Sequence, residues 1–337
     1  MEDRKFLIVG SNVRNVAESA RKAGFEVFAL TKHVDADLKL YAKKIFRIDD
    51  ESPEWVKDKA LTISEELDAE IVWHSGYEVL GDRRLKKIVN KRKFYSELER
   101  AGFDFPEILD DGESGILKPV TGGGGEGIRL SSREEDGHIL QRYVEGIPCS
   151  ASVISTGKKA LAISFNRILV GDVNFGAGEF RYCGNITPFK HEFEDRAKRL
   201  AEELATYFEL EGNIGVDFII GDRVYVLEIN PRFQGSLDAI EWAYDINLFR
   251  MHLNAKAGKL ESCRPRRFAG RAVVFAEREI KIKNSPTGNP FFADVPEKNQ
   301  IYRKDDPLVS VLASGVSEHD VYRKLYERKE IYREIAC

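Results

Sequence analysis

GNIGVDFII (Gly212–Ile220) and LEINPRFQG (Leu227–Gly235) are two apolar stretches that the sequence predicts to be paired strands. Because side chains alternate across a strand, Glu228 and Asn230 point to the same face of the second strand. We expect Asp217 of the first strand to share that face. Carboxylate and amide oxygens are the ligands that Mg²⁺ prefers, usually completed by substrate phosphates. The two strands therefore predict a magnesium-nucleotide site in a chain that uses ATP.

The pairing of the two strands is predicted from the turn between them. Gly221–Asp222 has the composition of a two-residue hairpin turn, which pairs Ile220 with Arg223. Counting back along both strands places Asp217 opposite Val226. This register puts the three oxygen-bearing side chains in one patch.

Length and composition limit the classes of protein that the chain can be. Its 337 residues allow two or three domains of roughly 100 to 200 residues each. The net charge of -4 gives no reason to expect nucleic acid or an acidic membrane as a partner. The four cysteines are widely spaced, and no apolar run approaches a membrane span, so we expect a soluble, cytoplasmic protein.

The chain begins with a predicted β-α-β unit: strand Lys5–Gly10, helix Asn15–Ala23 and strand Glu26–Thr31. No Gly-x-Gly-x-x-Gly follows the first strand, so a dinucleotide-binding fingerprint is absent there. Open parallel sheets bind ligands beyond the carboxyl ends of their strands. Polar residues at those ends either line a substrate cleft or are ordinary loop residues: Ser11, Asn12, Arg14, Asp35, Asp37, Ser75 and Glu78.

A glycine-rich loop, TGGGGEG (Thr121–Gly127), lies between two short strand-like segments. It matches Gly-x-Gly-x-x-Gly literally, but no helix follows it, so it predicts a strand-to-strand flap and not a dinucleotide fold. The backbone N–H groups of such a flap can close over phosphates, with Lys118 supplying a positive charge. The alternative is a flexible surface turn.

HILQRYVEG (His138–Gly146) is a further predicted strand, located between the glycine loop and the metal patch. Its backbone at Tyr143 and Val144 could pair with the edge of an adenine. Alone, this segment predicts only an edge strand.

In order and spacing, these pieces resemble the ATP-grasp superfamily over nearly the whole chain. Within it, GSNVRNVAESARKAG, FRYCGNITPF and FFADVP resemble an archaeal-type group of predicted ATP-dependent carboligases related to biotin carboxylase. The resemblance implies a mixed α/β fold with three parts. These are a Rossmann-like substrate-side domain (1–90), a two-lobed ATP-grasp domain (91–262, with its nucleotide flap at about 115–150) and a small β-rich C-terminal part (263–337).

The resemblance also implies roles for individual residues, with ATP and Mg²⁺ (or Mn²⁺) as cofactors. Arg232 would face an acyl phosphate and, with Lys118, act in catalysis. Gln141 replaces the more usual glutamate at the adenine amino group, and Glu145 is the candidate for holding the ribose. The implied ATP-binding residues are Lys91, Lys118, Gly123, Gly124, Gly125, Gln141, Tyr143, Val144 and Glu145; the implied metal ligands are Asp217, Glu228 and Asn230.

The implied activity is a carboxylate-amine ligase that acts on small molecules through an acyl phosphate and releases ADP and phosphate. Two alternatives stay open: a carboxylase or carbamoyl-phosphate type activator of bicarbonate, and a non-catalytic nucleotide-binding module. The segment Phe180–Phe189 is interpreted either as a substrate wall that includes Arg181 and Asn185 or as a structural bend. Ser11, Asn12 and Arg14 are the other substrate candidates, and the resemblance allows a homodimer.

Overall fold

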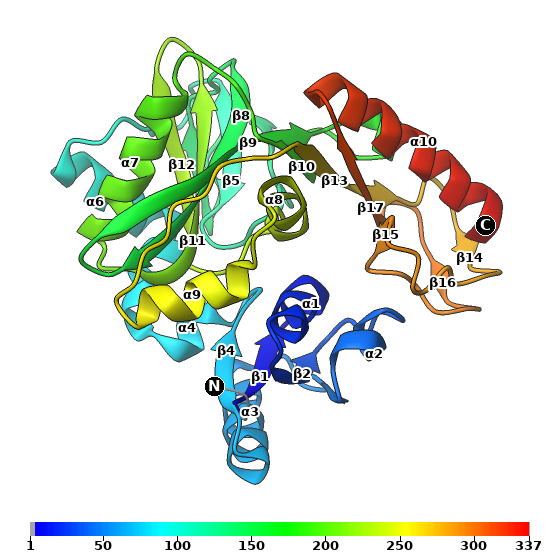
Figure 1. Ribbon diagram of the computed structural model, residues 1–337. Helices are drawn as coiled ribbons and strands as arrows, with labels where there is room; N and C mark the ends of the chain where they lie inside the picture. Colours follow the sequence, from blue (N-terminus) through cyan, green and yellow to red (C-terminus); the bar gives the residue numbers. More distant parts are fainter. Residues whose placement is uncertain (1–3, 337) are drawn as a thin grey trace.

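The computed structural model describes residues 4–336 (Figure 1). The first part of the chain folds into a parallel sheet with the strand order β3-β2-β1-β4. The predicted β-α-β opening is present, with both strands at their expected bounds and the helix shifted by one residue. The elements are β1 (Lys5–Gly10), α1 (Arg14–Lys22), β2 (Glu26–Thr31), α2 (Leu38–Tyr41), β3 (Lys44–Arg47), α3 (Pro53–Leu67) and β4 (Glu70–Trp73).

A helical segment and a small antiparallel sheet follow. The sheet has the order β6-β5-β7, and the glycine-rich loop joins β5 to β6, as a strand-to-strand loop does. Helix α6 begins at Lys91 and ends before Gly102, whose φ of 75° is left-handed, as glycine permits. The elements are α4 (Glu78–Gly81), a 3₁₀ turn (Arg83–Leu85), α5 (Lys86–Val89), α6 (Lys91–Ala101), β5 (Gly115–Pro119), β6 (Arg129–Ser131) and β7 (His138–Gln141).

The largest element of the fold is an eight-stranded sheet with the order β12-β11-β8-β9-β10-β13-β17-β15. Its strands come from both sides of residue 263, the expected start of the C-terminal part, because β10 pairs with β13. The strands are β8 (Ile147–Thr156), β9 (Ala160–Val170), β10 (Tyr182–Thr187), β11 (Glu211–Ile220), β12 (Val224–Asn230), β13 (Phe268–Phe275), β15 (Phe292–Ala293) and β17 (Pro307–Gly315); β14 (Ile280–Lys281) and β16 (Ile301–Tyr302) form a separate pair.

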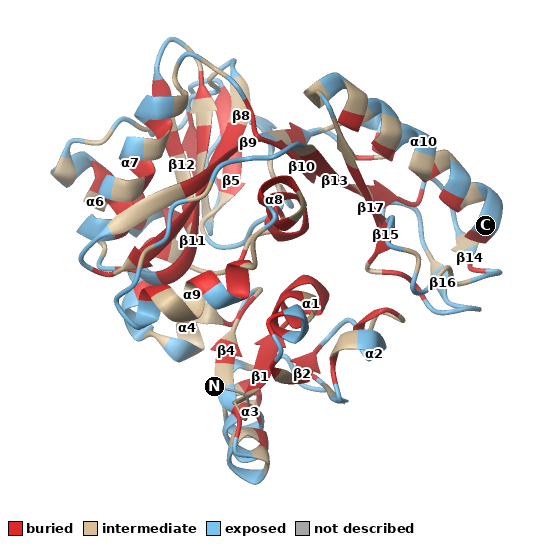
Figure 2. Ribbon diagram, in the orientation of Figure 1, coloured by how far each residue is buried: buried red, intermediate tan, exposed pale blue. Residues whose placement is uncertain are grey.

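Helices cover this sheet and bury its apolar side chains (Figure 2). Helix α7 (Glu194–Tyr207) packs on β8 and β9, and α10 (Glu318–Ala336) packs on β13 and β17. The sequence over residues 237–253 has a helical pattern throughout. In the structure, α8 (Leu237–Tyr244) and α9 (Leu248–Lys256) are separated at Asp245, which has a left-handed φ of 53°. Among residues 4–336, no helix is both long and apolar enough to cross a bilayer.

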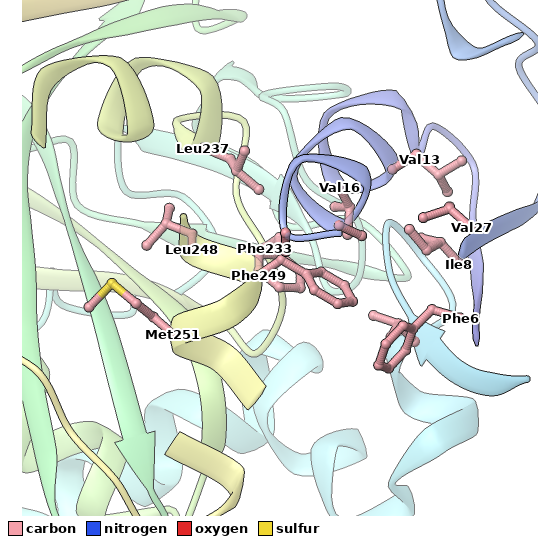
Figure 3. Close-up of a cluster of buried hydrophobic side chains, with 14 of the residues drawn as sticks. Phe6, Ile8, Val13, Val16, Val27, Phe233, Leu237, Leu248, Phe249 and Met251 are labelled. Carbon is pink, nitrogen blue, oxygen red and sulfur yellow. The ribbon is translucent and has the colours of Figure 1, made fainter. Parts of the chain in front are cut away.

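The N-terminal sheet is joined to α8 and α9 by a buried apolar cluster (Figure 3). Phe6 of β1 meets Phe249 of α9 edge to face, with ring centroids 5.0 Å apart. Phe249 in turn stacks on Phe233, at 5.8 Å and 8° between planes. Phe233 follows directly after Arg232, so this cluster fixes the segment that leaves the predicted metal patch.

Glu241 of α8 is a buried carboxyl group in this interface. One of its oxygens accepts hydrogen bonds from Ser19 Oγ at 2.5 Å and from the backbone N–H of Leu248 at 2.8 Å. Burial raises the pKa of Glu241 to about 7. Between the ordinary pKa of a glutamate and about 7, the folded protein therefore holds a proton that the unfolded chain has lost. The free energy of unfolding should fall as the pH rises through this window.

We expect Glu241→Gln to remove that loss, because glutamine keeps the acceptor oxygen and carries no charge. The gain in unfolding free energy should reach about 1–3 kcal/mol above pH 7 and vanish below pH 5. Urea titrations at several pH values measure it, with the exposed Glu203→Gln as the matched control. A gain that is the same at every pH would show that Glu241 is not the group that titrates.

Candidate active site

A cleft of about 880 Å³ separates one face of the eight-stranded sheet from the N-terminal sheet and the glycine-rich loop. Seven of the eight strands contribute at least one side chain to its floor. From one edge to the other these are Glu228 and Asn230 (β12), Asp217 (β11), Ser150 (β8), Ile168 (β9), Asn185 (β10), Arg271 (β13) and Ser310 (β17). A single sheet therefore carries both ends of the cleft.

The register of β11 and β12 differs from the expected one. Asp217 lies opposite Glu228 and not opposite Val226. The turn has three residues instead of two, since Ile220 pairs with Val224, and a β-bulge follows at Leu227. Each irregularity shifts the pairing by one residue.

The bulge changes which side chains face the cleft. Leu227 and Glu228 are consecutive, yet both line it, together with Asn230. The freed carbonyl of Leu227 accepts a hydrogen bond from Tyr95 Oη at 2.7 Å. The three oxygen-bearing side chains thus form one patch, although by a different register.

The patch has the composition of a site for a hard cation. Asn230 Nδ2 donates to Asp217 Oδ2 at 3.1 Å and to Glu228 Oε1 at 3.2 Å, so the amide holds two carboxylates together. Burial, and then the adjacent Glu228, raise the pKa of Asp217 well above its usual range. Two crowded carboxylates and an amide fit Mg²⁺, provided that the Asn230 amide flips its oxygen inward.

Two lysines lie beside this patch. Lys91 Nζ donates to the carbonyl of Gly122 at 2.9 Å and lies 3.8 Å from Glu228 Oε2. Lys118 Nζ donates to Gln141 Oε1 at 2.8 Å. Burial, only partly offset by Glu228, lowers the pKa of Lys118 to about 8. Both ammonium groups line the cleft together with Gly123, Gly124 and Gly125.

The predicted adenine contacts are placed differently. Gln141 is fully buried and does not line the cleft, because its amide bonds Lys118 and donates to the Pro106 carbonyl at 2.7 Å. Gln141 therefore positions Lys118. A side chain that is buried in this way does not fit a direct contact with adenine. Tyr143, Val144 and Glu145 also lie outside the residues that line the cleft. Their roles stay predictions.

Arg232 lies at the junction of the patch and the N-terminal sheet. Its guanidinium donates to Asn230 Oδ1 at 3.1 Å, and its Nε is 3.3 Å from Glu78 Oε1. His74, which follows β4, also lines the cleft. Burial and then Arg232 lower the pKa of His74 to about 3, so its ring is neutral. At this junction the positive charge therefore comes from Arg232 and not from His74.

The opposite end of the cleft is built around Arg271. Its guanidinium donates to Asp294 Oδ2 at 2.5 Å, to Ser310 Oγ at 2.9 Å and to the Gly235 carbonyl at 2.9 Å. Asp35 reaches the same end from the N-terminal sheet. This end thus combines residues from both sheets.

The expected substrate residues divide into two groups. Ser11, Asn12 and Asn185 line the cleft, as do Asp35 and Ser75. The assignment of Arg14 to substrate is wrong for this structure, because its side chain is fully buried among carboxylates. Arg181 does not line the cleft either; it donates to the Asp305 carbonyl at 2.6 Å and lies over the Phe275 ring.

Several residues that line the cleft are not predicted from the sequence: His74, Tyr95, Gln234, Arg271 and Asp294. Arg271 interrupts the apolar run of β13, FAGRAVVF, and this lone charge was the one available signal. The others have no distinguishing local pattern.

Residues 88–236 match the ATP-grasp domain family. Two solved structures show the same fold, each at 15% sequence identity. One is the biotin carboxylase domain of 2-oxoglutarate carboxylase from Hydrogenobacter thermophilus, in complex with MgADP, ADP and bicarbonate; it covers 96% of this chain and 89% of its own, with a TM-score of 0.75. The other is L-amino acid ligase from Bacillus licheniformis, which covers 98% of both chains with a TM-score of 0.69. Residues 88–236 therefore match an ATP-grasp domain, and the whole chain has the mixed α/β fold that the resemblance implied.

The chain is also similar in sequence to several proteins, among them two from Methanocaldococcus species. An uncharacterized protein of Methanocaldococcus jannaschii is 27% identical over 353 residues, which are 92% of this chain and 88% of that protein. Tyramine–L-glutamate ligase of Methanocaldococcus fervens is 33% identical over 118 residues, which are 35% of this chain and 36% of the ligase.

Proposed function

We propose that the protein is an ATP-dependent carboxylate-amine ligase that forms an acyl phosphate and releases ADP and phosphate. The observation that carries this proposal is the single cleft that holds the carboxylate patch, two lysines, the glycine loop and Arg232. The likeness to an L-amino acid ligase and to a tyramine–L-glutamate ligase supports a reaction that joins an acid to an amine. The three-part domain division and a cytoplasmic location belong to the same proposal.

The first proposed step activates the acid. An oxygen of the substrate carboxylate attacks the γ-phosphorus of ATP, the bond from this phosphorus to the bridging oxygen breaks, and ADP leaves with the electron pair. Lys91, Lys118 and the loop N–H groups hold the phosphates and their developing charge. Asp217, Glu228 and Asn230 would hold Mg²⁺, which supplies charge neutralisation on the phosphate oxygens.

The second proposed step forms the product. The amine nitrogen attacks the acyl carbon, a C–N bond forms, and the C–O bond to phosphate breaks. Arg232 is placed to stabilise the oxyanion and the departing phosphate. No protein nucleophile is required.

The test is to incubate the protein with Mg-ATP, pooled carboxylic acids and hydroxylamine, and to measure ADP, phosphate and hydroxamates. ADP together with a hydroxamate is expected, because hydroxylamine traps acyl phosphates. Release of AMP and pyrophosphate would contradict the mechanism. ADP release that needs only bicarbonate would favour the carboxylase-type reaction instead.

The glycine loop provides a prediction with its own control. Gly125 has a left-handed φ of 80°, and a Cβ there would lie 1.9 Å from the Phe180 carbonyl oxygen. We expect Gly125→Ala to displace the loop and raise the KM for ATP roughly tenfold. Gly123→Ala is the matched control, because a Cβ at Gly123 meets nothing within 4 Å. Equal KM values for ATP in the two variants would show that the position of the loop does not affect nucleotide binding.

A further inference from the structure

Asp35 is a carboxylate that lines the cleft at the Arg271 end and has no ion-pair partner in the part of the chain that the structure describes. It lines the cleft beyond the end of β2 and accepts one hydrogen bond, from Asn12 Nδ2 at 3.2 Å. Within residues 4–336, no lysine, arginine or histidine nitrogen lies within 4 Å of its oxygens. The nearby Lys32 is paired with Glu51 at 2.6 Å.

The backbone holds Asp35 in a fixed place. The N–H of Ala36 donates to the Val295 carbonyl at 2.8 Å. The carboxylate of Asp37 accepts the N–H groups of Asp294 at 3.1 Å and Val295 at 2.9 Å. Asp35 is therefore held against the Asp294 and Arg271 end of the cleft by its own neighbours in the chain.

Negative charge exceeds positive charge at this end. Asp37, Asp238 and Asp294 each have an arginine within 4 Å, but only Arg14 and Arg271 serve all three. Asp35 adds a fourth carboxylate. Burial, followed by Asp294 and Asp37, raises the pKa of Asp35 to about 8. A cation bound here would restore its charge, whereas an anion would add to the excess.

Asn185 is an independent indication of a ligand. Its side chain is 1% exposed and lines the cleft. Neither its Oδ1 nor its Nδ2 has a hydrogen-bond partner among the described residues. It lies directly across from Arg271 on the neighbouring strand, so both side chains share the cleft face. A buried amide without partners is costly unless a ligand satisfies it.

Building on the proposed ligase function, we propose that this end of the cleft binds the ammonium group of the amine substrate. Asp35 is its counter-ion, and Asn185 Oδ1 is a further acceptor for its protons. The carboxylate can then take one ammonium proton, which leaves the neutral amine that attack requires. The second proton leaves with the phosphate, and the one on Asp35 passes to solvent. The bound substrate is thus an amine that arrives as a cation.

The experiment compares two acceptors of the same acyl group. Hydroxylamine is uncharged near neutral pH, so its reaction does not need a counter-ion. A panel of cationic primary amines, tyramine included, does need one. For Asp35→Asn we expect kcat/KM for the amines to fall about 10- to 100-fold, while hydroxamate formation stays within about twofold of wild type. Asp58→Asn, an exposed charge on α3, is the matched control.

A second variant tests Asn185 without removing a charge. Because Asn185 makes no side-chain hydrogen bond in the free protein, Asn185→Leu should leave the thermal midpoint unchanged or raise it. It should still lower kcat/KM for the amines. If Asn185 had only a structural role, Asn185→Leu would lower the thermal midpoint and leave kcat/KM for the amines unchanged.

The outcomes separate the two proposals. If wild type forms neither ADP nor hydroxamate with any acid, the proposed ligase function fails. If hydroxamate forms but Asp35→Asn keeps its kcat/KM for amines, or loses both acceptors equally, the ammonium site is overturned.

Discussion

Glu228→Gln is expected to slow ATP-dependent ADP release by a factor of about 10²–10³ and to leave the protein folded. Glutamine fills the same space but has no charge, so the patch loses one of the two carboxylates proposed to hold Mg²⁺. In the free protein this carboxylate raises the pKa of Asp217, which shows that the two oppose each other. The thermal midpoint of the variant should therefore be unchanged or higher.

Asp222→Asn is the control for Glu228→Gln. Asp222 belongs to the turn of the same hairpin, where its carboxylate accepts the Tyr225 hydroxyl at 2.7 Å. It is exposed and far along the strands from the patch, so ADP release should stay near wild type. ADP release by Glu228→Gln within a few-fold of wild type would place the metal elsewhere.

Arg14→Met is expected to lower the free energy of unfolding by about 3–5 kcal/mol at neutral pH. The fully buried guanidinium makes two bonds to Asp238, at 3.0 and 2.7 Å, and one to Asp294 at 3.1 Å. It also pairs with Glu18 at 2.6 Å. Methionine preserves much of the volume but leaves these carboxylates buried without their cation. The loss should shrink as the pH falls, because the carboxylates can then bind protons.

Arg4→Met is the matched control for Arg14→Met. Arg4 makes a two-pronged pair with Glu70, both bonds at 2.7 Å, but at the exposed surface. Urea unfolding of that variant should change by about 0–1 kcal/mol. Equal losses in the two variants would contradict the central role of the Arg14 network.

Several strands and the carboxylate patch can be predicted from the sequence, because each depends on a pattern of residues that are close together in the chain. Apolar runs of six residues locate β1 and β2 of the N-terminal sheet at Lys5–Gly10 and Glu26–Thr31. The patch at Asp217, Glu228 and Asn230 is found from the composition of two adjacent strands. These inferences need only residues that are close in the chain.

Where the sequence is insufficient, the missing information is three-dimensional. A one-residue bulge at Leu227 has no local pattern, so its effect on strand register cannot be counted. Arg14 follows a β-strand, as substrate-binding residues often do. Its carboxylate partners, Asp238 and Asp294, are 224 and 280 residues away. The role of Gln141 likewise depends on the hydrogen bond that it accepts from Lys118. Only the fold brings these two residues together.

The continuity of the eight-stranded sheet has a consequence for motion during a reaction cycle. Ladder hydrogen bonds connect β11, which carries Asp217, through β8, β9 and β10 to β13, which carries Arg271, with one irregularity in the β8–β9 pair and one in the β9–β10 pair. The spacing between these two groups is thus set by strands that cannot slide without breaking many bonds at once. The floor of the cleft therefore keeps Asp217 and Arg271 at a constant distance from each other. We therefore expect closure around substrates to come from the glycine-rich loop, because a buried apolar cluster fixes the N-terminal sheet to α8 and α9.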